Sequence, residues 1–284
     1  MYENFSSLAL FTEGPLWHRK IRQLHRLMSE YGIDLLSGCK MQTDWWFITK
    51  EEDRFCNLFG NGCPTWGIAA SNINDQRIWR NQWGGTCITT VGCFSSSVAE
   101  TGSDSSGLGR WTWVRVAGDR KTTRMIVAYQ PCDSRGRKTM GESVWDQHTC
   151  YFEAHGEIRD LRAMFKQDLV ILLRQWKTAS DEILLMGDFN ENVYTGPLSL
   201  ILSGDDLWMM EVCQRTTGLL LPPMHDRGQS PIDAIFGTAG LVCTAATLLP
   251  PHIGVGDHRV FVVDITSESV LGNILPWVIP LSGC

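Results

Sequence analysis

The sequence predicts an α/β protein in which two β-sheets pack face to face and helices cover the outer surfaces. Predicted strands outnumber predicted helices, and the helices lie between strands, which is typical of layered α/β architectures. A doubly wound nucleotide-binding fold is disfavoured because no glycine-rich loop follows an early strand. The chain has 284 residues and 43% hydrophobic residues, enough to bury one sizeable core, and the spacing of its motifs favours one domain over two.

The amino-terminal quarter predicts a strand, a helix and a second strand. Residues 1–14 are weakly patterned and predict at most a poor first strand. Pro15 opens a helix whose apolar residues recur at helical spacing as far as Gly32. Residues 33–38 form the next predicted strand. Residues 43–82 are rich in Trp, Asn and Gly and predict loops.

The centre of the chain predicts an antiparallel hairpin. Residues 84–91 predict a strand, and the polar residues 94–109 predict a surface loop. Residues 111–116 alternate apolar and polar side chains, as a half-buried strand does, and residues 124–131 form a second apolar run. The polar, turn-like segment 118–121 joins the two runs, so we expect the strands to pair directly.

The second half predicts a long helical region followed by strands. Residues 145–178 place apolar side chains on one helical face, and Gly156 is a candidate interruption. Pro197 opens a short helix. Further strands are predicted at residues 182–190, 232–236, 241–249 and 260–265.

The composition limits which cellular compartments and which binding partners are expected for this chain. The net charge is −6 and the pI about 5.6, so any nucleic-acid surface has to be a local basic patch. Ten cysteines are scattered without a CxxC pair, which predicts free thiols in a reducing compartment and no zinc site. Apolar runs are too short for a membrane helix and the start lacks a signal peptide. We therefore expect a soluble intracellular protein, nuclear or cytoplasmic.

The motif at residues 182–190 is the first candidate for chemistry. An apolar run ends at Gly187, and Asp188 and Asn190 follow at alternate positions. On an extended backbone, side chains two residues apart share a face. A carboxylate and an amide on one face can hold a water nucleophile beside a phosphate. The alternative is a buried strand that ends in an Asx turn.

Three further motifs lie in or beside predicted strands. Tyr129 stands two residues before a proline at a strand end. Asp233 lies in an apolar strand, where an unpaired charge is costly. Asp257 and His258 precede the last strand, so a His–carboxylate pair with Asp233 is expected. Each motif alone has a structural explanation, but the set in this order points to a phosphate-cleaving site.

This set resembles the endonuclease/exonuclease/phosphatase superfamily, the DNase I-like proteins, and in character is closest to LINE-type retrotransposon endonuclease domains. The resemblance covers residues 18–266. It implies a four-layer α/β/β/α sandwich of two mostly antiparallel sheets flanked by helices. It also implies one domain over residues 1–268, with truncation at the amino end left open, and an apolar tail over 269–284.

The resemblance implies a role for each matching residue. Asp188 would orient or deprotonate the attacking water, and Asn190 would hold the water and the phosphate. His258 would donate to a phosphate oxygen, and Asp233 would orient its imidazole. Tyr129 would contact the phosphate or the leaving group. The cofactor implied is Mg²⁺ or Mn²⁺, supported by Asp257 and by the less certain candidate Asn4.

One departure from the family pattern bears on activity. Lys40 stands where the family has its metal-binding glutamate, and a cation there repels a divalent ion. Three explanations stay open. The ammonium pairs with Asp188 or Asp257 and replaces the metal, a nearby carboxylate (Asp44 or Asp34) substitutes, or the alignment is shifted by a few residues. A milder departure is Gly256, where serine is usual.

The resulting expectation is a retroelement-derived, metal-dependent DNA endonuclease whose activity is impaired by Lys40. Alternatives are an inositol-phosphate or lipid phosphoesterase and a catalytically dead phosphate-binding remnant. DNA is the expected partner, with no membrane and a monomeric state. His225 is a second candidate for substrate contact, although a solvated loop histidine is the simpler explanation. The tryptophans are candidates for base stacking, with packing the simpler explanation: Trp45, Trp46, Trp66, Trp79 and Trp83.

Overall fold

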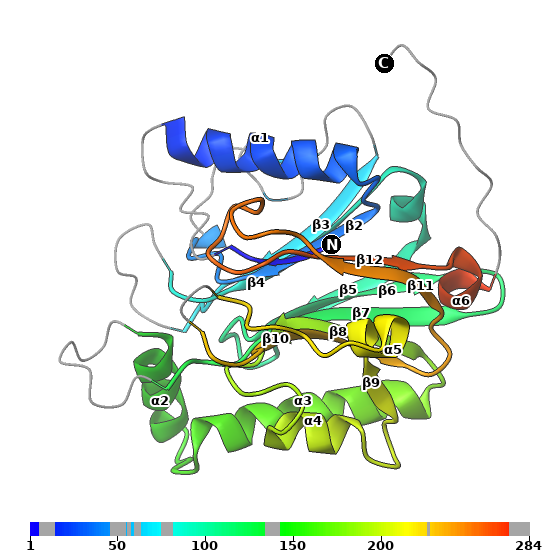
Figure 1. Ribbon diagram of the computed structural model, residues 1–284. Coiled ribbons are helices and arrows are strands. Elements are labelled where there is room, and N and C mark those ends of the chain that lie inside the picture. Colours follow the sequence, from blue (N-terminus) through cyan, green and yellow to red (C-terminus); the bar gives the residue numbers. More distant parts are fainter. Residues whose placement is uncertain are drawn as a thin grey trace.

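Two mixed β-sheets pack face to face with helices on both outer surfaces (Figure 1). The computed structural model describes residues 1–5, 15–45, 55, 58–59, 64–74, 82–133, 143–225 and 228–272. Helix α1 (Pro15–Glu30) covers one sheet, and helices α3 (Leu161–Thr178) and α4 (Pro197–Leu202) cover the other. The predicted α/β/β/α sandwich is confirmed.

The first sheet has six strands in the order β11, β12, β1, β2, β4 and β3. Its strands are β1 (Tyr2–Asn4), β2 (Leu35–Cys39), β3 (Thr65–Ala70), β4 (Thr86–Val91), β11 (Cys243–Leu248) and β12 (Phe261–Ile265). Strands β1 and β2 run parallel, and the other neighbours are antiparallel. The chain's first strand therefore sits in the middle of a sheet.

The second sheet also has six strands, in the order β5, β6, β7, β8, β10 and β9. Its strands are β5 (Val98–Ser103), β6 (Trp111–Ala117), β7 (Thr122–Tyr129), β8 (Glu182–Asp188), β9 (Met209–Glu211) and β10 (Asp233–Thr238). Only β7 and β8 are parallel among these pairs. The predicted β6–β7 hairpin is confirmed.

The main core lies between the sheets and continues under α3. Its fully buried side chains include Tyr2, Ile88, Val127, Leu185 and Phe261, which come from both sheets. A second cluster joins α1 to the outer face of the first sheet. Burying an aliphatic side chain contributes roughly 1.5–3 kcal/mol, so this packing holds the strand ends in place.

The helices match the patterns that predicted them, with one interruption. The region 145–178 forms two helices, α2 (Val144–Ala154) and α3, separated at Gly156. Gly156 has a φ of +76°, a left-handed conformation that favours glycine. Helix α4 begins at Pro197 as expected.

Two strands were missed in regions predicted as loops. Strand β3 lies within residues 43–82, and β5, preceded by the 3₁₀ helix η3 (Gly92–Ser97), lies within residues 94–109. Both are edge strands. An edge strand has one neighbour and a largely solvated surface, so its sequence shows no strong apolar alternation.

Several short elements complete the fold. Helix α5 (Val212–Thr217) follows β9, and helix α6 (Ser267–Leu271) follows β12. Val270 and Leu271 are buried, so the folded part continues beyond the predicted end of the domain at residue 268. The rest of the apolar tail lies outside the described residues, as do Trp46 and Trp79.

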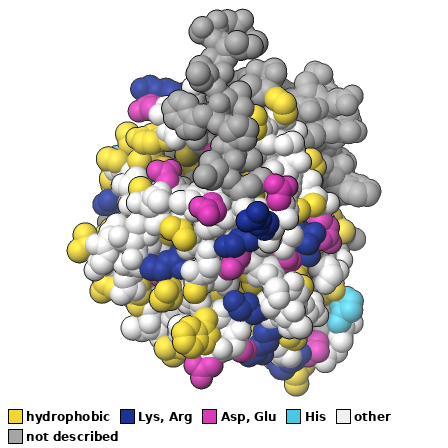
Figure 2. All heavy atoms as spheres, turned by 90° about the vertical axis from the view of Figure 1, so that its right-hand side faces the viewer, with side chains coloured by type: hydrophobic (Ala, Val, Ile, Leu, Met, Phe, Trp, Pro, Cys, Tyr) yellow, Lys and Arg dark blue, Asp and Glu magenta, His cyan; other side chains and the backbone are white. Residues whose placement is uncertain are grey.

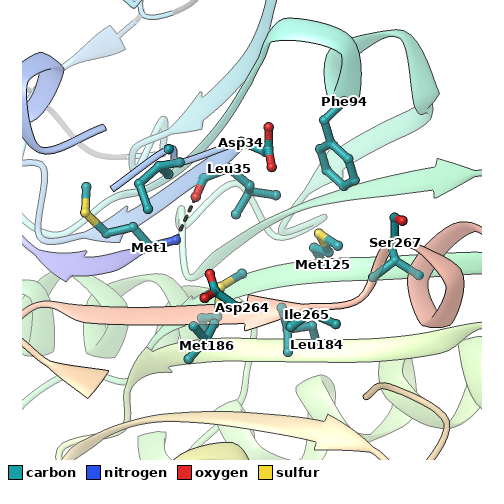
Figure 3. Close-up of a pocket in the computed structure, with 14 residues that line it drawn as sticks. Met1, Asp34, Leu35, Phe94, Met125, Leu184, Met186, Asp264, Ile265 and Ser267 are labelled. Carbon is teal, nitrogen blue, oxygen red and sulfur yellow. Dashed lines mark hydrogen bonds between the residues drawn. The ribbon is translucent and has the colours of Figure 1, made fainter. Parts of the chain in front are cut away.

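The end of the sandwich near α6 contains an apolar cavity of about 180 Å³ between the sheets (Figure 3). Met125, Leu184 and Met186 line it, and the terminal ammonium of Met1 donates to the carbonyl of Leu35 beside it, 2.8 Å away. Figure 2 shows this end face, where basic and acidic side chains are interspersed. The residues predicted for catalysis are absent from the cavity lining.

None of the described helices is long and apolar enough to cross a membrane. The seven cysteines that the structure describes are unpaired.

Candidate active site

Four strands bring polar side chains to the end of the sandwich opposite α6. Asn4 ends β1, Lys40 follows β2, Asp188 ends β8 and Asp233 begins β10. Parallel pairing aligns Asn4 with Cys39, and antiparallel pairing sets Asp233 directly opposite Asp188. Residues distant in the sequence thus meet at one mouth between the two sheets.

The Asp188 carboxylate is fully buried and fully partnered. Its Oδ2 accepts hydrogen bonds from Lys40 Nζ at 2.8 Å and from Asn4 Nδ2 at 2.9 Å. Its Oδ1 accepts from the backbone N–H of Asn190 at 3.0 Å. A buried carboxylate needs such donors, because leaving it unpaired costs several kcal/mol.

Asp233 and His258 form the expected pair. Asp233 Oδ2 lies 2.5 Å from His258 Nδ1, and Asp233 Oδ1 accepts a hydrogen bond from the Tyr2 hydroxyl at 2.8 Å. Burial disfavours the charged imidazole, but the adjacent Asp233 carboxylate outweighs burial and raises the pKa of His258. The Asn4 amide lies 3.3 Å from Nδ1 and links this pair to Asp188.

Lys40 points into the same cluster. It has a φ of +55°, unusual for a lysine, so the chain turns sharply after β2. Burial disfavours the ammonium, yet the Asp188 carboxylate dominates, and the pKa of Lys40 lies above its ordinary value. The ammonium also stands 5.6 Å from the centre of the Tyr129 ring, within cation–π range.

The cluster has the spacing of a metal site but not its free ligands. Single atoms of Asp188, Asp233 and His258 lie within 4.8 Å of one another, which is a spacing that a metal ion can bridge. However, the Asp188 carboxylate already accepts from a lysine ammonium and two N–H groups. His258 Nδ1 and both Asp233 oxygens are also in use. With Lys40 in this position the donor set does not fit Mg²⁺, which needs free anionic oxygens.

Of the other predicted ligands, Asp257 lies at the edge of this cluster, and Asp34 and Asp44 are not part of it. Asp257 has a half-exposed side chain on the outer side of His258, 3.8 Å from its Nε2. Asp34 precedes β2 and lines the apolar cavity at the opposite end, so it cannot replace the missing glutamate. Asp44 is buried, but among the described residues it does not belong to the group of Asp188, Asp233 and His258 whose ligand atoms lie within 4.8 Å of one another.

Asn190 does not share an extended face with Asp188. It has a φ of +47°, so the strand has already ended and the chain turns back. The backbone N–H of Asn190 caps Asp188, which is the Asx turn considered as an alternative. The Asn190 side-chain amide donates to the carbonyl of Gln130 at 2.7 Å. The Asn190 backbone therefore lies against Asp188, but its side chain is engaged with Gln130 and does not share a strand face with Asp188.

A hollow of about 400 Å³ opens beside the outer edge of His258. His225, His252 and Asp257 line it together with the His258 ring. His225 and His258 are bridge partners, and their rings lie 5.7 Å apart. His225 Nε2 is 3.5 Å from Asp257 Oδ2. The structure therefore places His225 next to the predicted site. This position is the one that contact with a substrate would need.

Known proteins share this architecture at low sequence identity. The human Nocturnin catalytic domain with bound sulfate matches with a TM-score of 0.62 and 15% identity, covering 93% of both chains. The 3′ phosphatase NExo from Neisseria, bound to a product DNA hairpin, gives 0.61 and 13%, covering 93% of this chain and 97% of the other. An AP endonuclease from Archaeoglobus fulgidus gives 0.58 and 12%, with the same coverages.

The chain has the DNase I-like fold. No family model matches the sequence, and no curated protein matches it by sequence. The shared architecture therefore supports the resemblance that the four motifs predicted, at the level of the fold.

Within this DNase I-like fold, two site residues escaped sequence reasoning. Tyr2 donates to Asp233 and lies 3.2 Å from the Cys39 thiol. Glu3 Oε1 accepts from the backbone N–H groups of Val255 and Gly256, so it ties β1 to the loop that carries His258. A three-residue strand is too short for a periodic pattern, and only the adjacent Asn4 signalled that the segment matters.

Glu3 gives this site a predicted pH dependence of stability. Burial raises its pKa from 4.5 to about 7, although the two backbone donors and Lys20 oppose the shift. Between these pH values the unfolded chain releases a proton that the folded chain keeps, so folding stability falls as pH rises through this window. Glu3→Gln removes the effect and should be more stable than the native chain by roughly 3 kcal/mol at pH 8, but not at pH 4.

Urea unfolding from pH 4 to pH 8 measures this difference. Glu153→Gln, at an exposed glutamate on α2, is the matched control and should follow the native curve. A Glu3→Gln difference that stays constant across the range would contradict the assignment.

Gly256 is explained by the close approach of two backbones. A Cβ at this position would lie 1.8 Å from the carbonyl oxygen of Asn4. Gly256→Ala should therefore push the His258 loop away from β1 and destabilise the fold by about 1–3 kcal/mol, as overpacking does. Urea unfolding tests this, with Gly204→Ala as the control because the nearest atom there is 3.2 Å away. Equal losses in the two variants would argue against the steric explanation.

Proposed function

We propose that the chain is a phosphoesterase of the endonuclease/exonuclease/phosphatase type, derived from a retroelement DNA endonuclease and acting as a monomer on DNA phosphodiesters. In this proposal Lys40 impairs the hydrolysis. The observation that carries the proposal is the convergence of Asp188 and the Asp233–His258 pair at one mouth of a DNase I-like sandwich.

The roles proposed for the site residues follow from their contacts. His258 has its Nδ1 engaged by Asp233, so its Nε2 faces the adjoining hollow and can donate to a phosphate oxygen. We propose that Asp188, once freed from its ion pair with Lys40, orients or deprotonates a water, and that Asn190 holds the water and the phosphate. Tyr129 pairs in register with Asp188 and is the candidate for contact with the leaving group.

DNA is the proposed substrate for two reasons. The residues of the four motifs resemble those of retrotransposon endonuclease domains. In addition, two of the structural neighbours are a 3′ phosphatase bound to a DNA hairpin and an AP endonuclease. The neighbours also include a mannosyl-6-phosphatase, so the same fold serves other phosphate esters.

The proposed impairment follows from charge. In the family pattern an anionic glutamate stands at the end of the second strand, whereas here an ammonium occupies that position and neutralises Asp188. A carboxylate in an ion pair is a poorer base and a poorer ligand. The native chain should therefore cleave slowly or not at all.

Nicking of supercoiled plasmid tests the proposed function. The native chain and a Lys40→Glu variant are incubated with plasmid in Mg²⁺ or Mn²⁺, each alone and combined with Asp188→Ala or His258→Ala. Nicking by Lys40→Glu that both second substitutions abolish supports the proposal. If Lys40→Glu leaves DNA intact, the DNA endonuclease assignment is wrong. Native nicking as fast as that of Lys40→Glu rules out the impairment.

A second candidate function is favoured by the Lys40–Asp188 ion pair. A site with a built-in ammonium can bind a phosphate group without hydrolysing it. Titration calorimetry with inorganic phosphate separates the candidates. Phosphate binding that Lys40→Met abolishes, in a chain that cleaves neither DNA nor inositol phosphates, supports the binding role. Release of phosphate from inositol phosphates instead supports a phosphatase.

A further inference from the structure

A groove beside α1 presents three arginines on one exposed helical face. Arg19, Arg22 and Arg26 line it, at spacings of three and four residues that put side chains on the same side of a helix. The groove has a volume of about 420 Å³, and we call it the α1 groove. Arg19 and Arg26 lie about 10 Å apart along the helix axis at 1.5 Å per residue.

The second wall of the α1 groove is the loop that carries the catalytic histidine. Gln23 Nε2 donates to the carbonyls of Ile253 at 2.6 Å and Gly254 at 2.9 Å, which fastens α1 to this loop. Figure 1 shows the loop between β11 and β12 lying under α1. His252 lines both the α1 groove and the hollow beside His258. The two depressions are therefore neighbours on one surface.

The charge of the α1 groove is largely uncompensated. Within the described residues Arg19 and Arg22 form no ion pair, and Arg26 reaches only Glu30 at 3.6 Å, with both side chains mostly exposed. Such an exposed pair contributes little. By contrast, Arg110, Arg115 and Arg124 each lie within ion-pair distance of a mostly buried aspartate. Glu30 also lines the groove, so its three arginines and one glutamate leave a local excess of two positive charges, which is notable in a chain of net charge −6.

We propose that the α1 groove binds the phosphate backbone of a nucleic-acid strand and leads it to His258. Along the axis of a DNA duplex each strand carries one phosphate per about 3.4 Å, so a row of about 10 Å parallel to that axis spans about three phosphates of one strand. Guanidinium groups suit phosphate because they donate two parallel N–H groups. A concave groove that adjoins the active-site hollow fits a strand better than a flat membrane surface. This inference rests on the proposed function for the identity of the polymer.

The test measures binding without hydrolysis. Fluorescence anisotropy of labelled single-stranded and duplex DNA in EDTA is recorded for the full chain and for the triple variant Arg19→Glu/Arg22→Glu/Arg26→Glu. The control, Arg159→Glu/Arg174→Glu/Lys177→Glu, makes the same change in net charge at and beside α3, on the opposite outer layer. A triple Arg→Lys variant of the groove checks that charge, and not a lost helix, is responsible.

The expected result is a rise of about tenfold or more in the apparent Kd for the groove Glu variant, and a smaller salt dependence of binding. The control and the Lys variant should stay within about twofold of the native value. Unchanged DNA binding by the groove Glu variant overturns the proposal. The proposal is also overturned if the groove Glu variant loses binding to phosphatidylserine vesicles but not to DNA, because the groove would then be assigned to a membrane surface.

The outcomes separate this inference from the proposed function. If the groove Glu variant binds DNA normally while Lys40→Glu nicks plasmid, the groove assignment fails and the endonuclease assignment stands. If binding falls in the groove variant but no variant hydrolyses DNA, the groove assignment stands and the hydrolase assignment fails.

Discussion

Replacing Lys40 with glutamate should produce a Mg²⁺-dependent nuclease that nicks DNA about a hundred times faster than the native chain, or more. The ammonium of Lys40 lies 2.8 Å from Asp188 and neutralises it. Glutamate removes that charge and adds a second carboxylate at the end of β2. A site with free anionic oxygens suits a hard cation. Metal-ion catalysis is worth several kcal/mol, and each 1.4 kcal/mol is tenfold in rate, so about a hundredfold is a conservative expectation.

Two controls make this prediction sharp. Lys40→Met removes the ammonium without adding a ligand and should not create Mg²⁺-dependent nicking. Lys177→Glu makes the same charge change near the carboxyl end of α3, far from the site, and should match the native chain. Direct Mg²⁺ binding is measured in parallel by calorimetry. Tight stoichiometric binding to the native chain would show that Lys40 does not block the site.

Removing His258 or its partner should cost the active Lys40→Glu variant about 10²–10⁴-fold in rate, the usual contribution of a positioned acid–base group. Asp233 lies 2.5 Å from His258 Nδ1 and raises the pKa of the imidazole. Without it, the ring loses both its orientation and the charge that would stabilise a phosphate oxygen. Asp233→Asn in the Lys40→Glu background should therefore lose nearly as much as His258→Ala.

Single-turnover nicking with saturating DNA measures this loss apart from binding. Tyr2→Phe is the graded control, because it removes one hydrogen bond to Asp233 and keeps the buried ring. It should cost about tenfold or less, in line with the net worth of a single hydrogen bond. Additive losses in an Asp233→Asn/His258→Ala double variant would mean that the two residues do not act as a pair.

The sequence predicted strands well where one face is buried, but it missed the edge strands β3 and β5, although it predicted the edge strand β11. Strand β7 is apolar and buried, whereas β3 and β5 are half-buried edge strands whose sequences lack the alternation that would have predicted them. Strand β1 was weakly patterned because it has three residues, yet tertiary contacts put it at the centre of a sheet. Local pattern is informative only over several residues.

The sequence likewise revealed some residues of the candidate site and missed others. Asp188, Asp233 and His258 were visible because each is a polar residue in or beside an apolar run: Asp188 ends one, Asp233 lies within one and His258 precedes one. Tyr2 and Glu3 were not, because what makes them part of the site is a hydrogen bond to a residue more than 200 positions away. Asp257 matched its motif and lies 3.8 Å from His258 Nε2, but it is not grouped with Asp188 and Asp233 within 4.8 Å.

By itself, the sequence determined the architecture and the list of chemical groups, since periodicity and strand-end polar residues are local properties. It also determined that a cation stands in place of the expected glutamate. Only the tertiary structure decided which of three explanations for Lys40 the geometry favours. A buried carboxylate must be paired, and in this fold the donor that reaches Asp188 is the Lys40 ammonium. The position of α1 over the His258 loop was equally invisible, because it depends on packing between segments far apart in the chain.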